Sequence, residues 1–294
     1  MLAFRRIKKF LPLMVIIGLI AVPGSIFFIR SPVLVITDPS FEALYGPMRL
    51  MLSRVKSSLI LFRRLVPVTV TESAAPSLLA LAAEEASLSP LAVIFPYRYM
   101  EGARLYKKEH EDTPVLVMGG RASKPVNETE LIFIRTDLAR DYYRAGLYAA
   151  VFAGESRNVL FFTDQTITEE YRSAFRSGLN ARNFTGDPVF LDSSVEYSSF
   201  SGVGCVVVSG PASKFLEKNL QIPIICFSWT DPALMPRSVK LIFDDSPWAL
   251  LIRAVKNLLS GGGDTPIPSE QIIRLDKEGK KDFRIIYDLV KEES

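Results

Sequence analysis

Short apolar runs recur along the whole chain, and longer stretches of mixed polarity separate them. Most of these runs are continuously apolar and rich in β-branched residues, and few alternate with polar residues. This is the pattern of parallel strands that helices cover on both faces. We therefore expect strands over residues 33–37, 66–70, 91–95, 115–118, 131–134, 159–162, 205–208, 222–227 and 241–243.

Several stretches between the runs have helical spacing. After Asp137, apolar residues recur every three or four positions until a glycine stands where a helix C-cap would lie. Thr166 and Glu169 form a capping-box pattern, and Ser246 and Pro247 have the order of an N-cap and a first-turn proline. Strands that alternate with helices of about 10–15 residues predict βαβ units and an α/β fold.

Two of these units have a similar sequence pattern, which we call the echo. The segments 137–154 and 245–262 each begin at an aspartate after an apolar run and end at a glycine after an amphipathic stretch. The echo fits two lobes that the chain enters through similar crossings. We expect a basic flank and membrane segment over 1–31, a first lobe over 32–136 plus about 246–275, a second lobe over 137–245, and a charged tail over 276–294.

The N-terminus carries a membrane-segment pattern. Residues 10–29 form a run of 20 residues without a charge, and four basic residues precede it. About 20 apolar residues are what a helix needs to cross a bilayer, and the basic flank places the N-terminus in the cytoplasm. We expect an uncleaved single-pass anchor in the cytoplasmic (inner) membrane, with the bulk of the chain extracytoplasmic or periplasmic. A cleaved signal peptide is the alternative, although residues 21–25 offer a poor cleavage site.

Composition narrows the classes of function. The net charge of +3 is small and the basic residues are scattered, so we expect no nucleic-acid partner. Cys205 and Cys226 lie in apolar runs, where buried free thiols are favoured over a disulfide. The single histidine, His110, lies in a charged segment, which excludes a Ser-His-Asp arrangement and a histidine-rich metal site. Without a phosphate-binding glycine loop either, we expect no enzyme, no cofactor and no metal.

The order of these parts resembles the type I periplasmic-binding-protein superfamily over about residues 32–275. That superfamily includes sugar-binding proteins, the ligand domains of lactose-repressor-like regulators and the basic membrane protein family. The segments that carry the resemblance are the opening strand 33–38, the crossing 134–137 with Ala145-Gly146 after it, Phe175 to Gly178, the return crossing 240–246 and the closing stretch 266–274. The resemblance implies an α/β, two-lobed, three-layer αβα fold.

Two features depart from that family. A serine-rich stretch, 192–204, stands where the family has a full helix. The apolar N-terminal segment occupies the place of a DNA-reading helix-turn-helix, which argues against a repressor.

In open α/β sheets, ligands bind beyond the carboxyl ends of the strands. Aromatic residues there can stack on a sugar or base, and polar groups can orient it. If two lobes face each other at these ends, the candidate ligand-binding residues are Asp38, Phe41, Tyr97, Arg98, Asp137, Asp164, Trp229 and Asp245. Structural roles compete at the same positions: Asp38 and Asp137 as helix caps, Tyr97 as packing between lobes and Trp229 in the core of a loop.

Two hypotheses follow. The first is an extracytoplasmic solute-binding-like protein that holds a small polar molecule, of the sugar or nucleoside class, between two lobes and delivers it to a membrane transporter or sensor. The second is a non-enzymatic structural or interaction protein at the membrane that kept the fold and lost the pocket.

Overall fold

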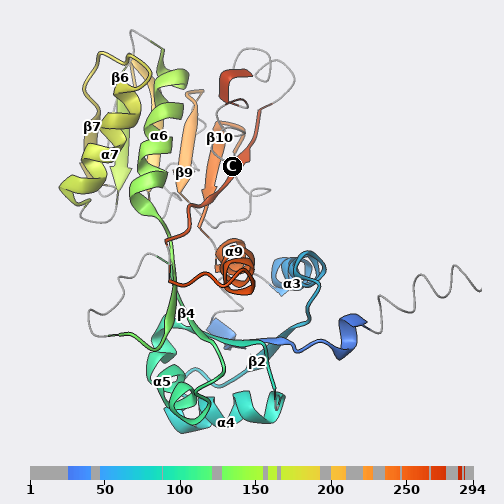
Figure 1. Ribbon diagram of the computed structural model, residues 1–294. Coiled ribbons are helices and arrows are strands. Elements are labelled where there is room, and N and C mark those ends of the chain that lie inside the picture. Colours follow the sequence, from blue (N-terminus) through green and yellow to red (C-terminus); the bar gives the residue numbers. More distant parts are fainter. Residues whose placement is uncertain are drawn as a thin grey trace, which may run out of the picture. The chain divides into compact units, whose positions relative to one another are not determined.

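A computed structural model describes residues 26–40, 47–87, 89–120, 128–154, 158–163, 167–192, 200–209, 221–227, 236–245, 247–264, 266–275, 284–286 and 288 (Figure 1). The chain divides into two compact units. The first comprises residues 1–119, 124–133 and 255–264, and the second comprises 120–123, 134–254 and 265–294.

The first unit is built on a five-stranded sheet in the order β2-β1-β3-β4-β5. Strand β1 pairs in parallel with both β2 and β3, and β3 pairs in parallel with β4. Every residue of β1 and β3 is buried, as the continuous apolar runs predict. The strands are β1 (Val33–Thr37), β2 (Leu65–Thr69), β3 (Ala92–Pro96), β4 (Val115–Gly120) and β5 (Ile132–Arg135).

Helices between these strands complete the first unit. They are α3 (Pro47–Leu61), α4 (Pro76–Ala86) and α5 (Met100–Glu109), and a 3-10 turn, η1 (Tyr97–Tyr99), leads into α5. Leu79 of α4 and Tyr106 of α5 pack with Ile36 and Phe95 of the sheet in one hydrophobic cluster. Burial of these apolar side chains is the main force that holds the unit together.

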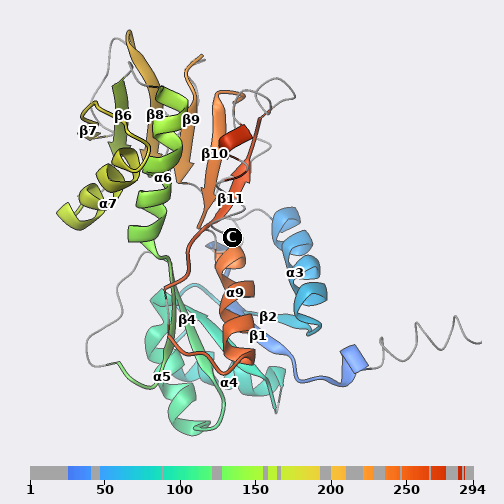
Figure 2. The same ribbon diagram turned by 45° about the horizontal axis from the view of Figure 1, so that its top comes forward.

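The second unit contains a six-stranded sheet in the order β11-β10-β9-β8-β6-β7. Its strands pair in parallel except for β11, which is antiparallel to β10 (Figure 2). The strands are β6 (Asn158–Thr163), β7 (Val189–Asp192), β8 (Val203–Ser209), β9 (Ile224–Phe227), β10 (Val239–Asp244) and β11 (Glu270–Ile273). Helices α6 (Leu138–Ala153) and α7 (Glu169–Asn180) belong to this unit, and α9 (Pro247–Leu259) has residues in both.

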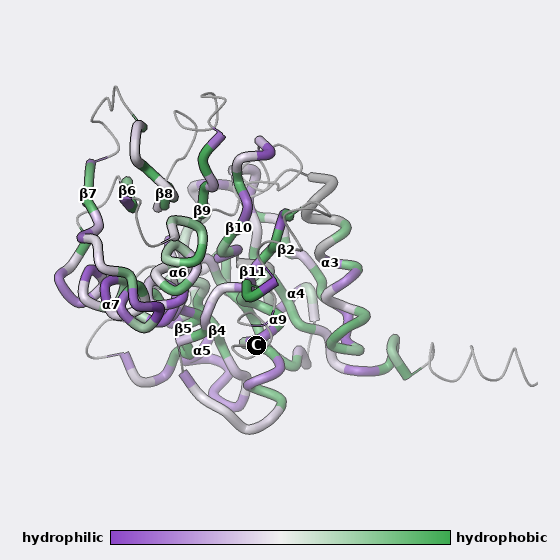
Figure 3. The backbone as a smooth tube through the Cα atoms, turned by 90° about the horizontal axis from the view of Figure 1, so that it is seen from above, coloured by the Kyte–Doolittle hydropathy of each residue, from purple (hydrophilic) through white to green (hydrophobic). Residues whose placement is uncertain are grey.

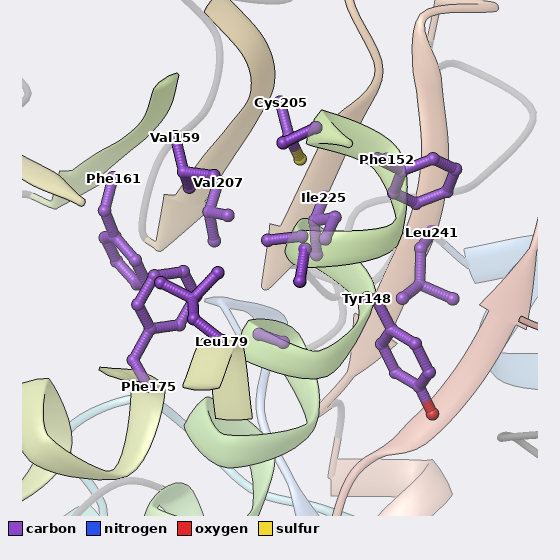
Figure 4. Packing of buried hydrophobic residues seen from close by; sticks show 14 of the residues in the cluster. Tyr148, Phe152, Val159, Phe161, Phe175, Leu179, Cys205, Val207, Ile225 and Leu241 are labelled. Carbon is purple, nitrogen blue, oxygen red and sulfur yellow. The ribbon is translucent and has the colours of Figure 1, made fainter. Parts of the chain in front are cut away.

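Two glycines allow α6 and α7 to pack closely. A Cβ atom on Gly146 would collide with the backbone oxygen of Phe175, and one on Gly178 would collide with the backbone oxygen of Tyr143. Both glycines belong to the segments that carry the family resemblance. Beneath this contact, Phe161, Phe175 and Leu179 meet in the core of the unit (Figure 4).

The sequence predicted most of these elements. All nine expected strands are present, with boundaries within two residues, and two α/β sheets of mainly parallel strands confirm the fold class at that level. Strand β7 was not predicted. The expected capping box is wrong in its N-cap, because α7 begins after Thr168, whose side chain makes no capping hydrogen bond. Thr166 lies outside the described residues.

The C-terminal part differs from the expected division into lobes. Residues 266–275 were expected with the first lobe, but β11 hydrogen-bonds along β10 in the second sheet. Of the tail, the structure describes residues 284–286 and 288, and Ile286 is buried in the core cluster of the second unit. Apolar residues in an otherwise charged tail explain this placement.

Three further expectations concern the ends of the chain and the thiols. Among the residues described, no helix is long and apolar enough to span a bilayer, and residues 1–25 lie outside that part of the chain. Most of the serine-rich stretch, 193–199, is also outside it. Cys205 and Cys226 are buried free thiols, as expected.

Candidate functional site

Asp38 lies at the carboxyl edge of the first sheet, directly after β1. Because β1 runs between β2 and β3 and parallel to both, the loops that follow these three strands start at the same edge. The Asp38 side chain is completely buried. A buried carboxylate needs charge-bearing or hydrogen-bonding partners, since desolvation of an unpaired charge is costly.

The partners of Asp38 come from its own loop and from the loop after β3. The Tyr99 hydroxyl donates a hydrogen bond of 2.7 Å to Oδ2, and the Arg98 guanidinium forms an ion pair with the same oxygen. Ser40 Oγ donates to Oδ1 at 3.1 Å and accepts from Arg98 Nη2 at 3.0 Å. We call Asp38, Ser40, Arg98 and Tyr99 the Asp38 cluster.

The turn η1 sets the directions of three successive side chains. Tyr99 is buried, whereas the side chains of Tyr97 and Arg98 are partly exposed, that of Arg98 by 44%. The Arg98 guanidinium lies 5.2 Å from the centre of the Tyr99 ring, within the range of a cation–π contact. Tyr97 packs edge-on against Phe133, with 6.4 Å between ring centres.

The electrostatics of the Asp38 cluster keep Tyr99 a hydrogen-bond donor. Burial, followed by the hydrogen bond to Asp38, raises the pKa of Tyr99 to about 12. The hydroxyl also lies 3.2 Å from the backbone oxygen of Glu72, in the loop after β2. The cluster therefore holds one arginine side chain, 44% of it exposed, in a fixed place at the sheet edge, where its free N–H groups could donate to a hydroxyl-bearing or anionic molecule.

The carboxyl edge of the second sheet carries a different group, centred on Tyr142 of α6. Its hydroxyl lies 3.0 Å from Ser209 Oγ at the end of β8. Its ring is stacked on Phe161 and Tyr171, each with 5.4 Å between centres, and Phe227 lies at 5.0 Å. Tyr142, Ser209, Phe161 and Phe227 are all buried, so this group belongs to the core of the second unit just below the strand ends.

The other candidate residues are distributed as follows. Asp137 is the N-cap of α6 and accepts a hydrogen bond of 3.1 Å from the backbone nitrogen of Arg140, so its structural role is that of a helix cap. Asp245 is buried directly after β10. Phe41, Asp164 and Trp229 lie outside the described residues. The structure thus brings Asp38 and Arg98 together. Tyr97 precedes Arg98 on the same turn, η1.

Sequence reasoning missed a buried polar network in the second unit. The carboxylate of Asp141 accepts from Ser269 Oγ at 2.6 Å and from the Ser269 backbone nitrogen at 3.0 Å. Arg144 Nη1 lies 3.7 Å from this carboxylate and donates to the Ser269 backbone oxygen at 3.4 Å. Next to the network, Thr136 and Ile267 form a parallel bridge. The start of α6 and the segment before β11 are therefore fastened together.

Burial dominates the chemistry of this network. It raises the pKa of Asp141 to about 7, although the hydrogen bonds from Ser269 and the charge of Arg144 act in the opposite direction. No exposed group takes part, because Asp141, Arg144 and Ser269 are all buried. The network therefore has a structural role: it holds the start of α6 against the segment before β11. In the described part of the chain, no group of His, Cys, Asp and Glu side chains is placed to hold a metal ion.

Comparisons with known proteins identify the fold. No protein-family model matches the chain. No curated protein matches its sequence. A transcriptional activator of the comK gene from Bacillus halodurans has a similar structure, with a TM-score of 0.61 at 10% identity over 89% of this chain and 96% of that one.

Two further solved structures extend the likeness. A periplasmic ribose ABC transporter protein from Conexibacter woesei gives a TM-score of 0.52 at 15% identity, over 87% of this chain and 95% of that one. A chain of the TorS sensor domain–TorT complex gives 0.50 at 13% identity, over 86% and 97%. The chain therefore has a type I periplasmic-binding-protein-like fold, which confirms the resemblance found in the sequence. At these identities the likeness defines the fold.

Proposed function

We propose that this chain is a non-enzymatic, extracytoplasmic solute-binding-like protein that binds a small polar molecule of the sugar or nucleoside class. The observation that carries the proposal is the Asp38 cluster at the carboxyl edge of the first sheet. Its buried carboxylate fixes Arg98, whose side chain stays 44% exposed. A fixed, partly exposed arginine side chain beside a tyrosine ring is suited to a molecule with hydroxyl groups and a flat or ring-shaped face.

The proposal extends to the carboxyl edge of the second sheet. Tyr142 and Ser209 are buried at that edge and hydrogen-bonded to each other, and Asp245 is buried directly after β10. In this proposal the solute contacts the carboxyl edges of both sheets, and closure of the two units around it is the conformational signal. Support comes from a solved structure of the same fold that is described as a periplasmic ribose ABC transporter protein.

The cellular setting is part of the proposal. The uncharged run at residues 10–29, with basic residues before it, supports a single-pass anchor in the cytoplasmic membrane and an exported chain. The partner would be a transporter or a sensor subunit. A structure of this fold solved together with a sensor domain supports the second of these.

A second candidate function has one observation in its favour. Arg98 is already bound to Asp38 and Ser40, and Tyr142 to Ser209, so side chains at both sheet edges satisfy each other. A protein that kept the fold but lost the pocket would show the same pairing. Its function would be to bind another protein at the membrane.

Thermal unfolding of the full chain in detergent separates the two functions. The panel is ribose, galactose, glucose, adenosine, uridine and a set of amino acids. A ligand at 100 times its dissociation constant stabilises the folded state by about 2.7 kcal/mol, which raises the unfolding midpoint by a few degrees. A rise with one chemical class supports solute binding and names the class. No rise with any compound supports the interaction protein.

A further inference from the structure

Helix α3 exposes an apolar face. Leu52, Val55, Leu59 and Ile60 are all exposed, Leu59 by 67%, while Ser57 and Leu61 point into the unit. Surface helices normally turn their apolar stripe toward the core, whereas here four large apolar side chains face outward. Figure 3 shows the same helix with hydrophobic and polar positions interleaved. We call Leu52, Val55, Leu59 and Ile60 the α3 face.

The chain enters the first unit beside the end of this helix. Phe27 packs against Phe62 with 5.9 Å between ring centres, and the Arg30 guanidinium lies 5.0 Å from the centre of the Phe62 ring. Arg63 Nη1 donates to the Ser31 backbone oxygen at 3.4 Å. Ile29, just before this contact, is 83% exposed. The end of the uncharged run and the two residues after it therefore contact the C-terminal end of α3.

The charge around the α3 face is of one sign. Residues 47–70 contain no aspartate or glutamate. Lys56 is exposed within the face itself, and Arg30 and Arg63 lie at its C-terminal end. Burial lowers the pKa of Arg63, and repulsion from the charge of Arg30 lowers it further. An apolar face with basic residues around it is typical of helices that lie on anionic membranes.

We infer that the α3 face docks on an anionic lipid surface, with its apolar side chains at the boundary between headgroups and acyl chains. This inference rests on the proposed anchor. If residues 10–29 enter the bilayer, the contacts of Phe27, Arg30 and Ser31 keep the end of α3 at the point where the chain leaves it. A helix of 15 residues is about 22 Å long, so its whole length stays near that point.

A second copy of the chain suits the α3 face less well. A symmetric pair would place the same surface of both copies together, so the basic groups of one would meet those of the other. Anionic headgroups neutralise these groups, and each basic residue at such a surface strengthens binding about fivefold.

The test uses the full chain with a single environment-sensitive NBD probe on Leu59→Cys. The native thiols do not compete for the label, because Cys205 and Cys226 are buried and burial raises the pKa of both. The matched control is Leu81→Cys on α4, an apolar residue of the same unit that is 47% exposed. Both chains are reconstituted in vesicles of equal parts phosphatidylglycerol and phosphatidylcholine, and in phosphatidylcholine alone.

In the anionic vesicles we expect the probe at Leu59 to shift to the blue and to be protected from an aqueous quencher, and the probe at Leu81 to stay in water. When Lys56→Glu is added to the Leu59→Cys chain, the ratio of docked to free helix should fall at least about fivefold. The reason is that the loss of one basic residue alone weakens binding by about that factor. Phosphatidylcholine alone gives a smaller shift.

Flotation of the same vesicles separates the docking from the anchor. If the chain floats but the Leu59 and Leu81 probes report equal exposure to water, the docking is overturned and the proposed anchor is retained. A chain that does not float overturns both. A third outcome is protection of the Leu59 probe in detergent, with protection that increases as the protein concentration rises. That result overturns the docking in favour of pairing between copies.

Discussion

The Tyr99 hydroxyl donates a 2.7 Å hydrogen bond to the buried carboxylate of Asp38, although 61 positions separate the two residues in the sequence. The bond joins the loops that follow β3 and β1, and Arg98 binds the same carboxylate from the neighbouring position. The cluster thus fixes the partly exposed Arg98 side chain on which the proposed function depends.

The first prediction concerns the stability that this bond contributes. Tyr99→Phe leaves a completely buried carboxylate with one donor fewer, so the free energy of unfolding should fall by about 1–3 kcal/mol. Denaturant unfolding of the full chain in detergent measures it. Tyr97→Phe is the matched control, because Tyr97 is partly exposed and its loss of a hydroxyl should change stability by less than about 0.5 kcal/mol. Equal losses in the two variants would contradict the role assigned to Tyr99.

The second prediction concerns Gly146 and Gly178, where α6 and α7 meet. Gly178→Ala should destabilise the chain by about 1–3 kcal/mol or more, because the new Cβ would collide with the backbone oxygen of Tyr143. Thermal unfolding followed by circular dichroism is the measurement. Gly263→Ala is the control, since no atom lies within 4 Å of the Cβ position there. If both variants unfold at the same temperature, the close packing of the two helices is not what requires glycine.

The third prediction is a pH dependence that arises from Asp141. The folded chain holds the Asp141 proton up to about pH 7, whereas the unfolded chain releases it near the ordinary value of 3.8. Between these values the folded state binds more protons, so this group lowers stability as pH rises from about 4 to about 7, and its effect is constant above that. The total is on the order of a few kcal/mol.

Comparison with Asp141→Asn isolates this effect. The variant has no proton to release, so the stability of the parent relative to the variant should fall as pH rises through that window. Asp137→Asn, which keeps a side chain able to cap α6, should follow the parent. A difference between parent and Asp141→Asn that is constant from pH 4 to 8 would mean that Asp141 is ionised throughout, held so by Arg144 and Ser269.

The fourth prediction separates packing from hydrogen bonding around Tyr142. Tyr142→Phe keeps the ring contacts with Phe161 and Phe227 but removes one hydroxyl that contacts Ser209, so stability should fall by only about 0.5–1.5 kcal/mol. Tyr142→Ala should cost about 3–5 kcal/mol because it empties the centre of an aromatic group. Similar losses in both variants would contradict the packing role.

The sequence predicted the fold well where strands are fully buried. Continuous apolar runs identify β1, β3 and β8, because burial on both faces requires apolar residues at every position. The edge strand β7 was not predicted because both of its ends are exposed and it has only four residues. The segment 266–275 was placed in the wrong lobe because nothing local in a sequence states which sheet an edge strand joins.

The candidate site was predicted in part, for a related reason. Asp38 and Arg98 were found because each follows an apolar strand, and the carboxyl ends of neighbouring parallel strands share an edge. Ser40 was not among the candidates, since only the folded loop shows which side chains reach Asp38. The Asp141–Ser269 contact joins residues 128 positions apart and has no local signature.

The most direct test of the proposed function is calorimetric titration of ribose, galactose, adenosine and uridine into the full chain and into Arg98→Gln. The account predicts saturable 1:1 binding of one chemical class to the parent. It also predicts affinity at least about tenfold weaker in the variant, as loss of a charge-assisted hydrogen bond requires. Binding that is equally tight in both proteins, or no heat from any compound with a folded parent, would contradict a solute site at the Asp38 cluster.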